Sequence, residues 1–354
     1  MKILSLFDGI SVGQQALKEL DIECEYYASE IDKYAIQITQ NNFPETKQLG
    51  SVVGLKIDFQ PDLLIGGSPC QDLSIAKKNR EGLKGSRSGL FYEYVRILKE
   101  VRPKYFILEN VNSMPREAKE TITQELFGIE PIMINAALVS AQNRKRLFWV
   151  GKLVGDNYEK VEISQPQDKG ILLKDILEDN VNESYSIYNK KLSVGKSSTI
   201  GSNPQCFTAK TGQCIPIRIG HLNQGGQGDR IYSPNGKSVN LSANGGGRGA
   251  KTGLYCVGII PESIKPKGNY LPRERVYSDE GKFRAVSTVN NQQPSILQNS
   301  TIRKLTPIEC ERLQSLPDNY AEGVSNTQRY KALGNAFNCE VIKHILKVVV
   351  DNQN

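Results

Sequence analysis

The stretch Ile3-Leu4-Ser5-Leu6-Phe7-Asp8-Gly9-Ile10-Ser11-Val12-Gly13 contains an apolar run, a glycine turn and the start of a helix. The apolar run predicts a buried strand, and Val12, Ala16, Leu17 and Leu20 follow helical spacing. Glu30 closes a second predicted strand, over 23–29, and lies 21 positions after Gly9. That spacing is close to the one at which a carboxylate meets a ribose hydroxyl. The loop is not GxGxxG, which favours an adenosine ligand without a diphosphate, although such glycines often only make a tight turn.

The segments downstream continue the alternation of strand and helix. Strand-like runs occur at 62–65, 105–108, 132–138 and 147–150, and helical patterns at 33–41 and 90–101. This order predicts an α/β fold in which helices cover both faces of a mostly parallel sheet. Near the other end, Thr306-Pro307-Ile308-Glu309 is a capping box that should open a helix to about Leu316, and a last helix is expected over 338–350.

Composition narrows the class of protein. The 354 residues carry a net charge of +7, with seven cysteines, no CxxC pair and two histidines. A disulfide framework or a zinc site is therefore not expected, and we predict a cytoplasmic protein. No apolar run has the length of a membrane helix, and the first seven residues are too short for a signal peptide.

The segment 184–300 differs from the rest of the chain. It holds nine Lys and six Arg against two Asp and three Glu, together with sixteen of the 31 glycines. The tetrapeptides Arg230-Ile231-Tyr232-Ser233 and Arg275-Val276-Tyr277-Ser278 recur in it, each followed by a Gly-Lys turn. We interpret the segment as a small, irregular β-rich domain with a degenerate repeat. Its charge suggests contact with a polyanion, and a solvated loop region is the alternative.

Three further motifs place reactive side chains at predicted strand ends. Gly66-Gly67-Ser68-Pro69-Cys70-Gln71-Asp72 sets a cysteine in a loop where a thiolate can be activated, although most cysteines are small buried hydrophobes. Glu109-Asn110-Val111 offers a buried general acid. Gln142-Asn143-Arg144-Lys145-Arg146 precedes the final strand, and alone it would be read as a solvated turn.

Together these motifs resemble, in order and spacing, those of the cytosine-C5 DNA methyltransferase family. Arg303 to Leu316 and Gly334-Asn335-Ala336 resemble the helix and the closing cofactor motif that end the family's pattern. The resemblance implies a Rossmann-like fold of the kind that binds S-adenosylmethionine. It divides the chain into a catalytic and cofactor-binding domain (1–183), an inserted target-recognition domain (184–300) and a C-terminal segment that returns to the catalytic domain (301–354).

The resemblance also implies a mechanism. The Cys70 thiolate would add to C6 of a cytosine that has been flipped out of the DNA duplex, while Glu109 donates a hydrogen bond or proton to N3. The methyl group would pass from S-adenosylmethionine to C5, leaving S-adenosylhomocysteine, and no metal is involved. Arg144 would hold the cytosine O2, whereas Arg146 would support the loop or the DNA backbone, and Gln71 would also contact DNA.

The cofactor pocket implied by the family comprises Phe7, Asp8, Gly9, Ile10, Glu30, Ser51, Pro69, Leu90 and Asn335. One position departs from the family pattern, because Gly50-Ser51-Val52 stands where Gly-Asp-Val is usual. Ser51 keeps an acceptor oxygen but lacks the charge. Lower cofactor affinity is therefore expected.

In the insert, Lys237 and Lys282 follow turn glycines and are expected to contact DNA phosphates. Arg230 and Arg275 occupy equivalent positions of the repeat. They would either read bases or pair internally, since Asp229 and Glu274 directly precede them. The repeat suggests two related β-ribbons that face one DNA groove.

Three alternatives stay open at this point. An RNA methyltransferase of the same fold typically has Pro-Pro-Cys-Gln and a smaller recognition region, so Ser68 and the long insert favour DNA. A nicotinamide-dependent dehydrogenase would need GxGxxG, and an inactive DNA-binding homologue would not need Cys70, Glu109 and Arg144. The expected partner is double-stranded DNA, with a cognate restriction endonuclease possible in the same system and no membrane. We expect a monomer.

Overall fold

One large sheet organises the protein, in the order β3-β2-β1-β4-β5-β7-β6, with β8 paired to β7. The computed structural model describes residues 1–68, 90–179 and 305–351, and short pieces between 192 and 303. The strands are β1 (Lys2–Leu6), β2 (Glu25–Ser29), β3 (Lys47–Gln48), β4 (Leu63–Gly67), β5 (Tyr105–Val111), β6 (Ile132–Asn135), β7 (Lys145–Val154) and β8 (Asn157–Lys160).

The sheet is parallel from β3 to β5, and β7 runs antiparallel to β5, β6 and β8. The predicted mostly parallel α/β sheet is therefore confirmed. The run predicted as one strand over 132–138 ends at Asn135, where a short 3-10 turn (Ala136–Leu138) begins. The Asn135 side chain explains this end, because its Oδ1 accepts a hydrogen bond from the Ala137 N–H at 3.1 Å.

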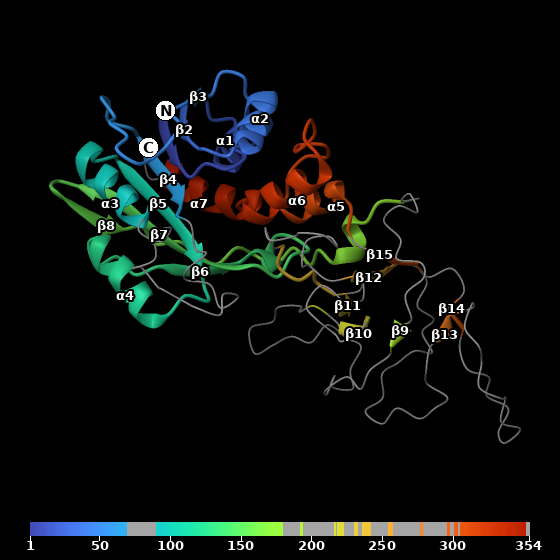
Figure 1. Cartoon of the computed structure of the whole chain (residues 1–354). Coiled ribbons are helices and arrows are strands. Elements are labelled where there is room, and N and C mark those ends of the chain that lie inside the picture. Colours follow the sequence, from blue (N-terminus) through green and yellow to red (C-terminus); the bar gives the residue numbers. More distant parts are fainter. Residues whose placement is uncertain are drawn as a thin grey trace, which may run out of the picture.

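Helices cover both faces of this sheet (Figure 1). The helices in the described part of the chain are α1 (Val12–Lys18), α2 (Lys33–Asn42), α3 (Leu90–Val101), α4 (Arg116–Glu125), α5 (Pro307–Leu313), α6 (Asn326–Asn335) and α7 (Cys339–Asp351). Alternation along the strands creates two cores. Ile3, Ile65 and Ile107 pack in the core that includes α1, α2 and α7, whereas Leu4, Leu64 and Phe106 pack in the core that includes α3 and α4.

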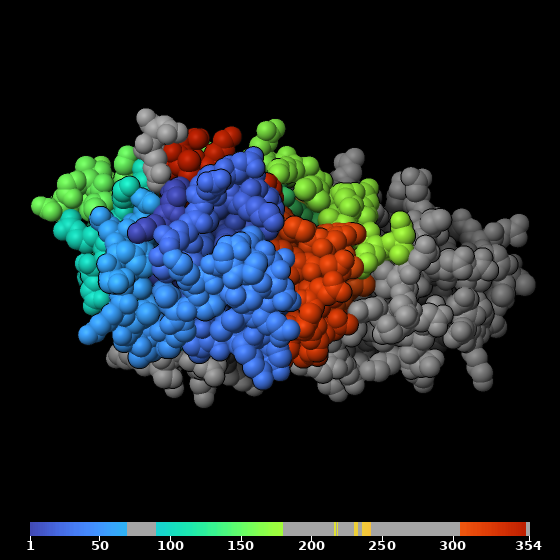
Figure 2. Space-filling model, turned by 90° about the horizontal axis from the view of Figure 1, so that it is seen from above, coloured from blue at the N-terminus to red at the C-terminus, as the bar shows by residue number. Residues whose placement is uncertain are grey.

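The C-terminal helices pack against the beginning of the chain. The Thr306 capping box is confirmed, with hydrogen bonds of 3.1 and 2.8 Å between Thr306 and Glu309. Asn42 Nδ2 donates to the Tyr320 carbonyl at 2.8 Å. Figure 2 shows the atoms of the N-terminal segment directly against those of residues 305–351.

The short strands described between 192 and 303 form a five-stranded sheet, in the order β15-β12-β11-β10-β9, and a separate pair, β13 and β14. These strands are β9 (Leu192–Ser193), β10 (Arg218–Leu222), β11 (Arg230–Tyr232), β12 (Leu254–Val257), β13 (Tyr277–Ser278), β14 (Ile296–Leu297) and β15 (Thr301–Arg303). The described parts of the two repeat copies, Arg230–Tyr232 in β11 and Tyr277–Ser278 in β13, lie in different sheets, and the two related β-ribbons that face one DNA groove stay a prediction. The domain boundaries themselves stay a prediction, and β15 pairs with the insert strand β12.

Within the part of the chain that the structure describes, no helix combines the length and apolarity needed to span a membrane.

Candidate active site

The loop after β1 bends through left-handed backbone angles and is largely buried. Phe7, Gly9 and Ser11 have φ angles of 57°, 63° and 55°. Glu30, at the end of the neighbouring β2, accepts a hydrogen bond from the Gly9 N–H through Oε2 at 2.8 Å. Its other oxygen accepts from the N–H groups of Ile31 and Asp32, at 2.7 and 2.8 Å. Glu30 therefore joins the carboxyl ends of β1 and β2, where ligands bind in such sheets.

Asp8 lies beneath this loop rather than on its surface. Its carboxylate is 6% exposed and accepts hydrogen bonds from the Tyr26 hydroxyl, at 2.9 Å, and from the Ser11 hydroxyl. Burial is the main cause of a raised pKa for Asp8, and the hydrogen bonds from Ser11 and Tyr26 oppose it. The structure thus places Asp8 as a support of the loop, whereas a direct cofactor contact was expected.

The Ser29 hydroxyl donates to the Gly50 carbonyl at 2.8 Å, which ties the segment that carries Ser51 to the end of β2. The Ser51 side chain is exposed, and its Oγ accepts from the Val53 N–H at 3.1 Å. Ile31 is 75% exposed at the same edge of the sheet. Sequence analysis missed Ile31; an apolar residue directly after a strand-end carboxylate was the signal that was available.

The remaining expected cofactor residues come from three different elements. Ile10 is buried, and its carbonyl accepts a hydrogen bond from the Tyr320 hydroxyl at 2.7 Å. Leu90 begins α3 and is half-buried, whereas Asn335 ends α6 and is exposed. Pro69 lies outside the described residues.

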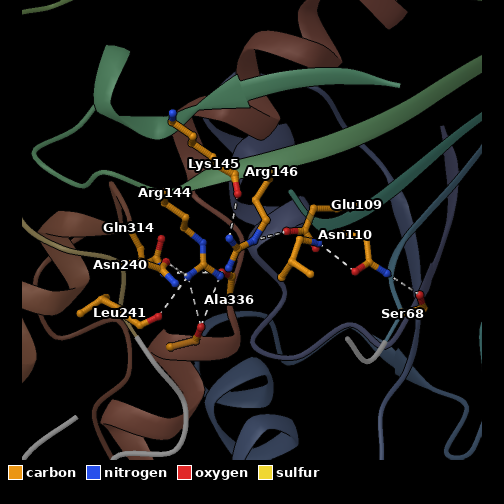
Figure 3. Close-up of polar contacts among 12 residues, drawn as sticks. Ser68, Glu109, Asn110, Arg144, Lys145, Arg146, Asn240, Leu241, Gln314 and Ala336 are labelled. Atoms are coloured by element: carbon orange, nitrogen blue, oxygen red, sulfur yellow. Dashed lines mark hydrogen bonds and ion pairs between the residues drawn. The ribbon is translucent and has the colours of Figure 1, made fainter. Parts of the chain in front are cut away.

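A largely buried ion pair lies at the other side of the sheet's carboxyl edge. Arg146 Nε is 2.7 Å from Glu109 Oε1, and the two side chains are 14% and 13% exposed. The antiparallel register explains the contact. Arg146 pairs with Val111, two residues from Glu109, so both side chains emerge on one face of β5 and β7. Figure 3 shows the Arg146 guanidinium turned toward Glu109.

Arg144 points to a different set of groups. Its guanidinium donates to the Ala336 carbonyl at 2.7 Å, to Asn240 Oδ1 at 2.8 Å, and to the Leu241 and Gly334 carbonyls (Figure 3). The side chain is 4% exposed. Arg144 was expected to hold the cytosine O2, but these acceptors already use its donors. The structure assigns it to joining three segments of the chain.

The loop that carries the predicted nucleophile starts next to Glu109. Asn110 Nδ2 donates to Ser68 Oγ at 3.1 Å, and both side chains are buried. A Cβ built on Gly67 would lie 2.9 Å from the Phe337 ring and 3.1 Å from Glu109 Oε2, so a larger residue there would displace one of these two side chains. Cys70 and Gln71 lie outside the described residues.

A small cavity adjoins the ion pair. Its volume is about 10 Å³, room for one water at most, and its lining includes Glu109, Arg146, Phe148 and Phe337. Among the described residues, no three His, Cys, Asp or Glu side chains are grouped to hold a metal ion. The described thiols of Cys310 and Cys339 are buried, and burial raises the pKa of each.

The structure places the insert residues that were predicted to contact DNA in different environments. Lys237 is wrong as a phosphate contact, because it is fully buried and its Nζ donates to the carbonyls of Ser140, at 3.0 Å, and Ile171. Arg230 is half-buried in β11, and its Nε has no hydrogen-bond partner among the residues that the structure describes. Arg275 and Lys282 lie outside the described residues.

Known proteins are similar to this chain over nearly its whole length. Orphan methyltransferase M.SPRI of Bacillus phage SPR is 26% identical over 99% of this chain and 97% of its own length. Type II methyltransferase M.HhaI of Haemophilus parahaemolyticus is 28% identical over 98% and 93%.

Among solved structures, the Entamoeba histolytica methyltransferase EhMeth has a TM-score of 0.64 at 19% identity and covers 100% of this chain and 99% of its own. The S. pombe Dnmt2 methyltransferase has a TM-score of 0.63 at 15% identity, with the same coverage. These structures show the same fold. The family model described as C-5 cytosine-specific DNA methylase matches residues 1–351. Because that match spans nearly the entire sequence, the chain belongs to the C-5 cytosine-specific DNA methylase family.

Proposed function

We propose that this DNA cytosine-5-methyltransferase takes its methyl group from S-adenosylmethionine and acts through a covalent bond between Cys70 and C6 of a flipped cytosine. Membership of the family gives the reaction class. The observation that carries the finer proposal is the Glu109–Arg146 ion pair, which lies at the strand ends beside Ser68, two residues before Cys70.

The residues at the β1 and β2 ends fit the cofactor. Glu30 offers carboxylate oxygens at the position of a ribose, and Ile31 offers an exposed apolar side chain for an adenine face. Ser51 is exposed on the segment that is tied to the end of β2, and in this proposal its hydroxyl meets the adenine amine. S-adenosylmethionine supplies a methyl group on a positively charged sulfur. The chain's own residues bind and orient it and exclude water.

Cys70 performs the activating step in this proposal. Its thiolate Sγ forms a bond to C6, and the electron pair of the C5–C6 double bond moves through the ring toward N3. For this step Glu109 gives up its ion pair with Arg146, takes up a proton and donates a proton or hydrogen bond to N3, so that C5 becomes nucleophilic, takes the methyl group and leaves S-adenosylhomocysteine. A base then removes the C5 proton, and the Cys70 thiolate leaves as the double bond re-forms.

Arg146, rather than Arg144, is proposed as the arginine of this site. Its guanidinium contacts the Glu109 carboxylate in a site with little exposure to water, where a fixed charge acts strongly. It is therefore placed to hold the cytosine O2 when N3 is bound by Glu109. The cavity of about 10 Å³ is smaller than a pyrimidine. Entry of the base must therefore displace side chains around the pair.

Double-stranded DNA is the proposed substrate, and the basic segment 184–300 is proposed to choose the sequence. A cytosine inside the duplex is out of reach of a buried carboxylate, so it must leave the stack. Orphan and type II methyltransferases are both among the relatives. A partner endonuclease thus stays a proposal, as do the monomeric state and the cytoplasmic location.

Bisulfite sequencing of DNA from cells that express the protein tests this proposal. We expect 5-methylcytosine at one defined sequence, and none with Cys70→Ser. DNA that contains 5-fluorocytosine should form a covalent adduct with the wild type only. Methylation confined to RNA would support the RNA alternative, and an adduct that persists in Cys70→Ser would refute the role of Cys70.

A further inference from the structure

A six-residue piece of the insert, Gly236–Leu241, is built into the wall of the catalytic domain. We call it the anchor segment. Among the described residues, Gly236, Lys237, Ser238 and Leu241 are all buried. A turn with the sequence Asn-Gly-Lys would ordinarily be solvated, so its burial requires specific contacts.

Backbone hydrogen bonds join the anchor segment to two loops of the catalytic domain. The Ser238 N–H donates to the Ala141 carbonyl at 2.7 Å, and the Asn143 N–H donates to the Ser238 carbonyl at 2.9 Å. The Gly236 carbonyl accepts from the Leu173 N–H at 3.0 Å. The segment is therefore paired with residues 141–143, directly before Arg144 and Arg146.

Lys237 adds a charged contact to both loops at once. Its Nζ donates to the Ser140 carbonyl at 3.0 Å and to the Ile171 carbonyl, while the side chain is 0% exposed. Burying an ammonium group is unfavourable unless it is hydrogen-bonded. An apolar side chain could be buried at this position with a smaller free-energy penalty than a charged lysine. Lys237 is thus fixed by directional hydrogen bonds to these carbonyl groups, and not by packing alone.

The next residues extend the connection to the active site. Asn240 Oδ1 accepts from Arg144 Nη1 at 2.8 Å, and Arg144 also binds the Ala336 carbonyl. The Arg144 N–H in turn donates to Asn135 Oδ1 at 3.0 Å, which fixes the start of β7. Arg146 lies two residues along this strand and contacts Glu109 (Figure 3).

From this chain of contacts we propose that Lys237 is a positioning residue, which ties the recognition insert to the catalytic domain and thereby holds Arg146 against Glu109. The inference rests on the proposed function, because the Glu109–Arg146 pair is placed there in the active site. It assigns to Lys237 an effect on the rate of methyl transfer. Lys237 does not contact DNA phosphates in this proposal, and other residues of the insert do.

The test compares Lys237→Met with Lys174→Met in the full-length protein. Both changes remove one positive charge, but Lys174 is exposed on the 3-10 turn Leu173–Ile176, next to the same loop. The single-turnover rate of methyl transfer is measured per S-adenosylmethionine-binding site, counted by calorimetry, so that misfolded protein does not lower it. The affinity for DNA is measured over a range of salt concentrations.

We expect Lys237→Met to lower that rate by roughly 10- to 100-fold, since displacement of a reacting group by about 1 Å has effects of this size. Its DNA affinity and salt slope should stay within twofold of the wild type, and Lys174→Met should match the wild type throughout. Lys237→Gln, which keeps an N–H donor, should give an intermediate rate and replaces the Met variant if that variant fails to fold. A normal rate in Lys237→Met, or a salt slope lower by about one unit, would overturn the proposal.

Hydrogen exchange on the ligand-free protein gives a readout that does not depend on activity. The amides of Asn143 and Arg144 should exchange at least tenfold faster in Lys237→Met and unchanged in Lys174→Met. Unchanged exchange at both amides in Lys237→Met would overturn the positioning role. A wild type that binds S-adenosylmethionine but transfers no methyl group would instead contradict the proposed function.

Discussion

Replacing Arg144 and Arg146 separately by methionine should separate stability from catalysis. Arg144 is 4% exposed and donates to Ala336, Asn240 and two further carbonyls. Hydrogen bonds to a charged group contribute about 1.5–3 kcal/mol each and are not additive. We expect Arg144→Met to lower the free energy of unfolding by about 3–5 kcal/mol, the usual effect of breaking a buried charged network. Arg146 has one carboxylate partner, and the 13% exposure of Glu109 lets water reach the carboxylate that is left behind, so Arg146→Met should lower it by only about 1–2 kcal/mol.

The effects on catalysis should have the opposite order. Loss of the Arg146 charge beside Glu109 removes a fixed electrostatic stabiliser, which typically lowers kcat about 100- to 1000-fold. Urea unfolding followed by circular dichroism measures stability, and single-turnover transfer of a labelled methyl group measures the rate per folded molecule. If Arg144→Met abolished transfer at unchanged stability while Arg146→Met stayed active, the assignment of the two arginines would be refuted.

Two further predictions concern the loop after β1, which we propose binds the cofactor. Glu30→Ala should weaken S-adenosylmethionine binding by roughly 1–3 kcal/mol, because the ribose and the Gly9 N–H each lose a partner, and equal affinities by calorimetry would count against the ribose contact. Burial raises the pKa of the Asp8 carboxyl above its ordinary value of 3.8. The native state therefore binds the carboxyl proton more tightly than the unfolded chain does. The stability that comes from this tighter binding is lost as pH rises through the pKa of the folded state. Asp8→Asn should therefore gain stability relative to the wild type as pH is raised from about 4 to 7 in urea titrations. If the free energy of unfolding of Asp8→Asn, relative to the wild type, stayed constant or fell as pH is raised, the raised pKa of Asp8 would be contradicted.

The order of strands and helices was predictable because apolar periodicity is strong in them. The runs at 3–7 and 62–65 and the helical face from Leu90 to Val101 lie within a few residues of β1, β4 and α3. The strand β8 was missed because Asn157–Lys160 is mostly exposed and polar, and pairs only with one edge of β7. The helix α6 was missed for a similar reason, since most of its side chains are polar.

The candidate site was harder to predict, because its geometry depends on register. A sequence motif places Arg144 and Arg146 two positions apart but does not say where the strand begins. β7 starts at Lys145 and pairs antiparallel with β5, which brings Arg146 rather than Arg144 to Glu109. Lys237 was misjudged because composition reports a charge but not the carbonyl groups, from loops far away in sequence, that enclose it.

The contact between Tyr320 and Ile10 has a consequence for how the protein is made. The hydroxyl of Tyr320 reaches a carbonyl that is 310 positions earlier in the chain, and Lys343 pairs with Glu19 across a similar separation. Chains emerge from the ribosome at about 5–20 residues per second, so the first loop waits on the order of tens of seconds for its partner. Contacts so distant in sequence also form slowly. The loop after β1 thus gains these contacts only after the last helices have been synthesised, and a prematurely terminated chain would lack a finished form of the site that we propose for the methyl donor.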